Sequence, residues 1–128
     1  MSLINVMNRL GNCKNPFQGG GRKVLCVCSA GLLRSPTAAL VLSQPPFNYN
    51  TRAAGVTKEF ALIPVDEVLV EWADEIVVME QWMADKIKTD YARDSTVLKI
   101  TDNYSYRDPK LITLIHSRYL NGVPIDDF

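Results

Sequence analysis

The sequence predicts an α/β fold of three layers, in which a four-stranded parallel sheet lies between helices on both of its faces. Two observations carry this prediction. Four short segments expected to be strands alternate along the chain with four longer segments of helical pattern, an alternation typical of parallel sheets. The first run, VLCV at residues 24–27, is apolar throughout, as expected of a strand that is buried on both faces.

The predicted elements follow one another as strand and helix from residue 24 onward. The strands are expected at residues 24–27, 49–54, 75–79 and 97–101. The helices are expected at residues 36–43, 64–72, 81–91 and 109–120. Pro36, Pro64 and Pro109 each fall in a first helical turn, where the missing N–H of proline leaves no helical hydrogen bond unmade. Asp108 is the predicted N-cap of the last helix, and Asn121-Gly122 ends it.

The chain divides into an N-terminal leader, residues 1–22, and one folded domain, residues 23–128. The leader contains several Asn, Gly and Pro residues, includes GGG at 19–21, and is expected to be mobile. No apolar run is long enough to span a bilayer, and the first residues lack the apolar region of a signal peptide. The protein is therefore expected to be cytoplasmic and without a membrane partner.

The charges are balanced overall but unevenly distributed. Lys+Arg and Asp+Glu both number 14, which argues against a nucleic-acid-binding protein as a whole. Every carboxylate side chain lies at Glu59 or later, so the N-terminal part is basic. This asymmetry fits a local anion site, and it also fits RNA or membrane contact.

The three cysteines point to a reducing compartment, because an odd number without framework spacing does not build a disulfide scaffold. They are also too few, with too few other ligands nearby, for a zinc site, so no metal is expected. Cys26 and Cys28 point the same way on a strand, which is poor geometry for a disulfide. Cys26 is assigned to core packing and Cys13 to an exposed thiol.

The stretch from Cys28 to Arg34 carries the strongest functional signal. Cys28 ends the first predicted strand, at the edge where open parallel sheets bind ligands. The backbone N–H groups of residues 29–34 are expected to form a nest for an anion, and the helix that opens at Ser35-Pro36 directs its N-terminal dipole at the same point. Arg34 supplies a planar fork suited to phosphoryl oxygens.

A thiolate at the centre of such a nest can attack a phosphate ester and form a cysteinyl-phosphate intermediate. Ser35 is expected to donate its hydroxyl to the sulfur. The structural alternative for Cys28 is a small buried core residue. The small residues Ser29-Ala30-Gly31 and the helix start that follow make catalysis the stronger interpretation, so the predicted fold includes a phosphate-binding loop after the first strand.

The run CSAGLLRSPTA resembles the signature loop of cysteine-dependent phosphatases, in which Cys, five residues and Arg precede Ser or Thr. Its place after VLCV, near the N-terminus, is similar to that in the low-molecular-weight protein tyrosine phosphatases. RAAGV, WADEIVVME and ITDNYSYRDP resemble a bacterial branch of that superfamily, and the resemblance covers about residues 23–120. It implies a catalytic domain without metal or cofactor, and a phosphate site formed by Ser29, Ala30, Gly31, Leu32 and Leu33.

Two positions depart from the loop of that family. Ala30-Gly31 replace its usual Gly-Asn pair, which removes an amide that helps to hold the loop. Leu33 stands where the family often has a second cysteine that shields the nucleophile by forming a disulfide. This redox protection should therefore be absent.

A phosphotyrosine substrate needs a general acid to protonate its leaving oxygen. No carboxylate side chain precedes Cys28, so the acid must come later in the chain. Asp102 and Glu80 both follow predicted strands. The resemblance matches Asp102 to the acid of the family, whereas Glu80 and Asp108 are assigned to helix starts.

The same resemblance matches Tyr104 to a tyrosine at the rim of the site. Tyr104 and Leu32 would then hold the substrate ring between them. For Tyr106, a place at this rim and a place in the core are equal alternatives. His116 is assigned a structural or exposed position, and Arg52 a solvated strand end.

The leading hypothesis is a protein tyrosine phosphatase that acts on a phosphotyrosine-containing protein or a small aryl phosphate, with inorganic phosphate or another oxyanion held in the loop. A thioredoxin-coupled arsenate reductase is disfavoured because no cysteine follows Cys28. A non-catalytic phosphate-binding module is the alternative from another class, and the intact set of Cys28, Arg34 and Asp102 argues against it. A nucleotide or RNA phosphatase is a third possibility, which only the basic N-terminal part suggests.

Overall fold

The computed structural model describes residues 22–29, 34–57, 59, 61, 63–101 and 108–122. Within this part of the chain, strands and helices alternate as the sequence predicts. Their order is β1 (Lys23–Cys28), α2 (Arg34–Ser43), β2 (Asn50–Gly55), α3 (Glu67–Trp72), β3 (Glu75–Val78), α4 (Gln81–Tyr91), β4 (Thr96–Val97) and α5 (Pro109–Gly122). The strands form one parallel sheet in the order β2-β1-β3-β4, which confirms the predicted fold class.

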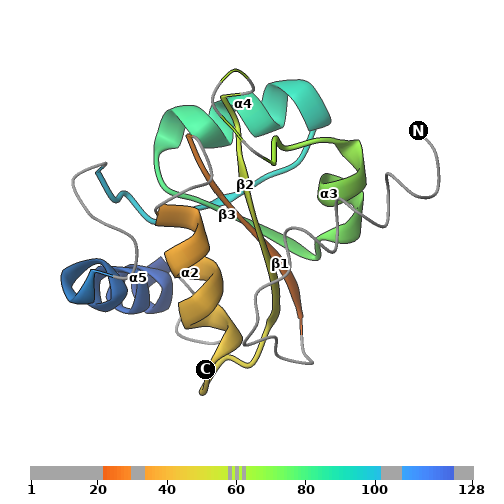
Figure 1. Ribbon diagram of the computed structural model, residues 1–128. Helices are drawn as coiled ribbons and strands as arrows, with labels where there is room; N and C mark the ends of the chain where they lie inside the picture. Colours follow the sequence, from red (N-terminus) through yellow and green to blue (C-terminus); the bar gives the residue numbers. More distant parts are fainter. Residues whose placement is uncertain are drawn as a thin grey trace.

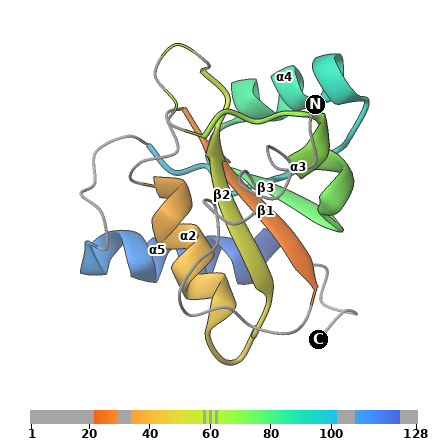
Figure 2. The ribbon, with the colours of Figure 1, turned by 45° about the vertical axis from the view of Figure 1, so that its right-hand side comes forward.

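The sheet lies between two helical layers. Figures 1 and 2 show α2 and α5 together on one side of it and α3 and α4 on the other. β1 is one of the two central strands, and all four residues of its VLCV run are fully buried. An uninterrupted apolar run is what a strand needs when helices cover both of its faces. The core extends from β1 into the inner faces of the helices.

The parallel register brings the carboxyl ends of the strands to one edge of the sheet. Cys28 at the end of β1 pairs with Gly55 on β2, and Val27 pairs with Val78 on β3. Helices α2 and α4 begin at this same edge, because each follows a strand directly in the chain. The edge therefore gathers two helix N-termini beside Cys28.

Two helices begin at other residues than predicted. α2 begins at Arg34 rather than at Pro36, so the arginine already belongs to the first helical turn. α3 begins at Glu67 rather than at Pro64, because the Asp66 side chain caps it by accepting a hydrogen bond of 3.0 Å from the Leu69 N–H. Pro64 instead forms an isolated bridge with Gly55. Pro36 thus lies inside the first turn of α2 and Pro64 precedes α3, so neither proline is the first residue of its helix.

The last strand is shorter than the predicted 97–101. β4 ends at Val97, and Lys99 has a φ of 59°, a left-handed conformation that a strand cannot contain. The chain nevertheless stays beside β3, because the N–H of Leu98 donates to Val78 O and that of Ile100 to Met79 O, each at 2.9 Å. This irregular segment continues the sheet toward the edge that holds Cys28.

Helix α5 begins as predicted. Asp108 Oδ1 accepts a hydrogen bond of 2.9 Å from the Lys110 N–H, which confirms the predicted N-cap. The helix extends further than predicted, because it includes Asn121 and Gly122, which were expected to follow its last residue. The leader at residues 1–22, except Arg22, lies outside the described residues, and the proposed division at residue 22 stays a prediction.

Candidate active site

Cys28 is buried at the carboxyl end of β1, with 4% of its surface exposed. Its Sγ lies 3.2 Å from the hydroxyl of Ser35, the second residue of α2. The Ser35 hydroxyl also donates to Ala54 O at 3.3 Å. A Cys28 thiol can thus donate to Ser35 while Ser35 donates to Ala54. Once Cys28 is a thiolate, the single Ser35 proton can turn to the sulfur and stabilise its charge.

Arg34 opens helix α2 and is 2% exposed. Its Nη1 donates to Glu80 Oε2 at 2.6 Å and to the backbone oxygen of Ile100 at 2.7 Å. These two acceptors come from the start of α4 and from the segment after β4. Arg34 therefore connects three segments at the carboxyl edge of the sheet. It precedes Ser35 in the first turn of α2.

Glu80 has a different role from the one its position suggests. Its backbone occupies the N-cap position of α4, but its side chain makes no capping hydrogen bond. The carboxylate pairs with Arg34 instead. The sequence analysis, which assigned Glu80 to the helix start, missed this contact. The available signal was a carboxylate directly after a buried strand, at the edge where the loop arginine was also expected.

Thr57 is a second residue that the sequence analysis did not identify. The Ser29 and Thr57 hydroxyls lie 3.0 Å apart, within hydrogen-bond distance. Two backbone hydrogen bonds accompany this contact, from Val56 N–H to Cys28 O at 3.0 Å and from Thr57 N–H to Ser29 O at 2.9 Å. The start of the loop after β1 is thus attached to the segment that follows β2.

Several predicted site residues lie outside the described part of the chain. They are Ala30, Gly31, Leu32, Leu33, Asp102 and Tyr104, together with Tyr106. Of the predicted catalytic set, the structure places the Ser35 hydroxyl beside the Cys28 sulfur, and Arg34 precedes Ser35 in the first turn of α2. The catalytic role of each of these residues stays a prediction.

The remaining candidates have structural positions among the described residues. Cys26 is fully buried in the core, as predicted, and burial raises the pKa of its thiol. His116 packs against Phe47 with the ring centroids 5.3 Å apart. The prediction for Arg52 was wrong: it is buried, and its guanidinium lies over the Trp72 ring, 4.7 Å from the centroid.

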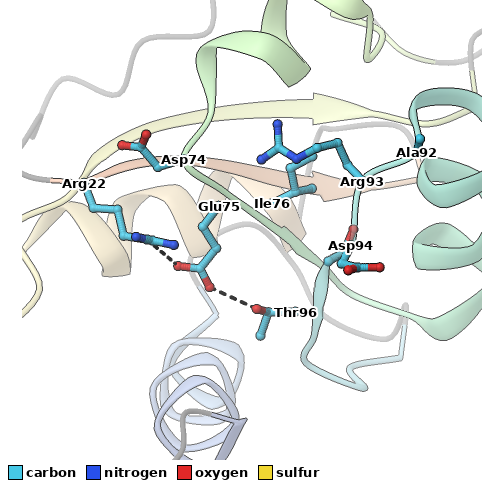
Figure 3. Close-up of a pocket in the computed structure, with 9 residues that line it drawn as sticks. Arg22, Asp74, Glu75, Ile76, Ala92, Arg93, Asp94 and Thr96 are labelled. Atoms are coloured by element: carbon cyan, nitrogen blue, oxygen red, sulfur yellow. Dashed lines mark hydrogen bonds and ion pairs between the residues drawn. The ribbon is translucent and has the colours of Figure 1, made fainter. Parts of the chain in front are cut away.

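A cavity of about 400 Å³ lies at the opposite edge of the sheet, away from Cys28 (Figure 3). Its lining comes from the amino ends of the strands and includes Arg22, Glu75, Arg93 and Thr96. Glu75 accepts hydrogen bonds from Arg22 Nε at 3.1 Å and from Thr96 Oγ1 at 3.0 Å, as Figure 3 shows. Arg93 donates to two carbonyls at the end of α3. These charged groups join neighbouring elements, so the cavity has a structural explanation.

The described residues offer neither a metal site nor a membrane-spanning helix. No group of three or more His, Cys, Asp or Glu side chains there is arranged to hold a metal ion. None of the described helices combines the length and hydropathy that crossing a bilayer would require.

Comparison with known proteins identifies similar folds. The YwlE arginine phosphatase from Geobacillus stearothermophilus superposes with a TM-score of 0.54 at 19% identity, over 79% of this chain and 92% of that one. A YwlE mutant from Bacillus subtilis superposes with a TM-score of 0.50 at 22% identity, over 80% and 91%. No protein-family model and no curated protein sequence matches the chain. At such identities the likeness concerns the fold, and it agrees with the fold implied by the resemblance to low-molecular-weight protein tyrosine phosphatases.

Proposed function

We propose that this protein is a phosphomonoester hydrolase that uses Cys28 as its nucleophile. The observation that carries the proposal is the contact between the Cys28 sulfur and the Ser35 hydroxyl at the carboxyl edge of the sheet, with Arg34 next to Ser35 at the start of α2. The Ser35 hydroxyl lies 3.2 Å from the sulfur, and Arg34 occupies the same helical turn. A thiol, a hydroxyl donor and a fixed guanidinium at a helix N-terminus are the groups that cysteine-based phosphoryl transfer requires.

The reaction has two steps. In the first, the Cys28 thiolate attacks phosphorus, an S–P bond forms, and the bond from phosphorus to the leaving oxygen breaks. In the second, water attacks the cysteinyl phosphate, and inorganic phosphate departs as the thiolate is restored. Ser35 stabilises the thiolate in both steps, and Arg34 offsets the charge that the phosphoryl oxygens carry in the transition state.

Asp102 is proposed as the general acid for the first step and the general base for the second. Its support is its place in the chain relative to Ile100, whose carbonyl oxygen lies 2.7 Å from Arg34 Nη1. Asp102 follows Ile100 by two residues, a span of at most about 7 Å of chain. This short connection to Ile100 is what supports Asp102 as the acid.

The substrate is proposed to be a phosphotyrosine-containing protein or a small aryl phosphate. The support is the sequence of the predicted rim, in which apolar Leu32 and aromatic Tyr104 suit a flat ring. The backbone of residues 29–33 would hold the phosphate. The odd number of cysteines, which builds no disulfide framework, supports the cytoplasm as the proposed location.

Phosphoarginine is the second candidate substrate, because one of the similar structures is described as an arginine phosphatase. A phosphoarginine substrate would present a P–N bond and a cationic leaving group where phosphotyrosine presents a P–O bond and an aromatic ring. The apolar residues Leu32 and Leu33 favour the ring. Arsenate reductase chemistry remains disfavoured, because it needs two further cysteines after Cys28 and the chain has none.

A substrate panel tests the proposal. The purified protein is assayed with a phosphotyrosine peptide, a phosphoarginine peptide, a phosphoserine peptide and a nucleoside monophosphate, and kcat/KM is compared. We expect the highest value on phosphotyrosine. A higher kcat/KM on phosphoarginine would show instead that the protein hydrolyses a P–N bond. If the protein binds an oxyanion but turns over none of these substrates, it is a non-catalytic phosphate-binding module and the hydrolase proposal is wrong.

A further inference from the structure

The pairing of β1 with β2 continues beyond the last residues of both strands. Cys28 pairs with Gly55 at the end of the regular ladder. The next two hydrogen bonds join Val56 N–H to Cys28 O and Thr57 N–H to Ser29 O. The backbone of the nucleophile and of the first loop residue is thus held by the segment that follows β2, on the side of β1 away from β3.

A side-chain contact is added at the same point. The Ser29 and Thr57 hydroxyls lie 3.0 Å apart, so that one donates to the other. Ser29 is also the only one of the five residues between Cys28 and Arg34 whose side chain can form a hydrogen bond, because Ala30, Gly31, Leu32 and Leu33 follow it. Among the loop's own side chains, Ser29 is therefore the one that can anchor it by a hydrogen bond.

We propose that Thr57 is a positioning residue whose hydroxyl, through Ser29, fixes the point at which the phosphate-binding loop leaves β1. This inference rests on the proposed function and adds a residue to its site. The far end of the loop is already fixed, because Arg34 is bound to Glu80 and to Ile100. The contact from Ser29 to Thr57 supplies the matching anchor at the near end, so that the residues on both sides of the predicted anion-binding segment are held.

The contact matters for catalysis because small displacements of a reacting group are costly. The loop backbone and the Cys28 sulfur must converge on the same phosphate, and loosening one end lowers the fraction of molecules in which they do. A single hydrogen bond has a modest net contribution. Its loss is therefore expected to lower kcat and oxyanion affinity by about two- to tenfold without unfolding the protein.

The experiment uses the full chain and four variants: Thr57→Val, Thr57→Ser, Ser29→Ala and the double variant Thr57→Val/Ser29→Ala. Each is assayed for kcat and KM with an aryl phosphate and titrated with tungstate, a tetrahedral oxyanion, by calorimetry. Thr57→Val and Ser29→Ala should show the same loss. The double variant should lose no more than either single variant, because both remove one bond. Thr57→Ser keeps the hydroxyl and should therefore show the kcat and the tungstate affinity of the parent protein.

Thr51→Val is the matched control. Thr51 lies on β2, the strand that precedes Thr57, and its hydroxyl donates a hydrogen bond of 2.8 Å to Ala39 O in α2, so the substitution removes an equivalent bond away from the loop. It should lower Tm while leaving kcat and tungstate affinity unchanged. This separates a loss of positioning from a general loss of stability.

The outcomes distinguish the positioning role from the proposed function. If the parent protein turns over no phosphate ester but binds tungstate, the hydrolase assignment fails and the titrations still test Thr57. If the parent is active and Thr57→Val matches it in kcat and tungstate affinity, the positioning role is wrong while the hydrolase assignment stands. Additive losses in the double variant would also overturn it, because they would show that the two hydroxyls act separately.

Discussion

Arg34 and Glu80 form an ion pair in which Nη1 lies 2.6 Å from Oε2, joining the first residue of α2 to the residue before α4. The guanidinium is 2% exposed and the carboxylate 35%. Because Ile100 O also accepts a hydrogen bond from Nη1, that nitrogen is committed to the protein. A bidentate contact with a phosphate would therefore have to use the opposite edge of the guanidinium, formed by Nε and Nη2. Glu80 thereby sets the rotation of the fork.

Glu80→Gln should lower kcat/KM by about tenfold, because the amide keeps an acceptor near Arg34 but no longer holds it by charge. A tenfold loss corresponds to about 1.4 kcal/mol of transition-state stabilisation. The free energy of unfolding should fall by about 1–2 kcal/mol, the lower part of the range for a charged hydrogen bond, since Glu80 is one-third exposed and water screens it. Steady-state kinetics and urea unfolding measure the two effects.

Glu67→Gln is the control for this substitution. Glu67 lies in the first turn of α3 and carries the same charge at a helix N-terminus, but it forms no ion pair with an arginine among the described residues. It should leave kcat/KM unchanged. If both variants lose activity equally, the effect of Glu80 arises from general electrostatics and not from Arg34.

Arg34→Lys should lower kcat/KM by several orders of magnitude. An ammonium group cannot bind Glu80 and Ile100 on one side while presenting a planar fork on the other. The variant should still fold, because lysine can retain the ion pair with Glu80. Kinetics on an aryl phosphate with thermal unfolding as the folding check test this. Near-parental kcat/KM would mean that Arg34 does not contact the transition state.

The sequence was sufficient for the parts of this site that are local in the chain. Cys28, Arg34 and Ser35 fall within eight residues, and a buried strand followed by a helix start is recognisable from composition alone. The contacts of Arg34 with Glu80 and of Ser29 with Thr57 join residues that are 46 and 28 positions apart. Such pairs depend on strand order and register, which the pattern of apolar runs does not specify. The helix starts at Arg34 and Glu67 were missed because proline tolerates several positions near an N-terminus.

Cys28→Ser should abolish turnover while tungstate binding largely survives. The substitution removes the nucleophile, whereas the oxyanion site is expected to consist of loop backbone and Arg34. Serine also keeps a polar atom beside Ser35. Calorimetric titration and an aryl phosphate assay give the two readouts. Appreciable residual kcat would rule out a covalent intermediate on Cys28.

Peroxide should inactivate the protein, and thiol reductants should restore little activity. Recovery requires a second thiol to trap the oxidised sulfur before it is oxidised further. Cys26 is the nearest cysteine in the sequence, but it is fully buried, and burial raises the pKa of its thiol, which keeps it protonated and unreactive at neutral pH. The recovered fraction of activity after peroxide and reductant measures this.

Cys26→Ala is the matching variant for that measurement. It should show the same low recovery as the parent protein, since Cys26 takes no part. Full recovery in the parent together with low recovery in Cys26→Ala would show instead that Cys26 protects the nucleophile.

The dependence of rate on the leaving group tests Asp102. General acid catalysis contributes about 10²–10⁴-fold, but only where the departing oxygen needs a proton. Asp102→Ala should therefore lose much of its kcat/KM on phosphotyrosine and little on an aryl phosphate with an acidic phenol. The pH profile of kcat/KM should lose its alkaline limb, because that limb reports the protonated acid. Plotted against leaving-group pKa, kcat/KM should fall more steeply for the variant than for the parent. Equal slopes would exclude Asp102 and direct the same test to Asp108, since Glu80 is bound to Arg34.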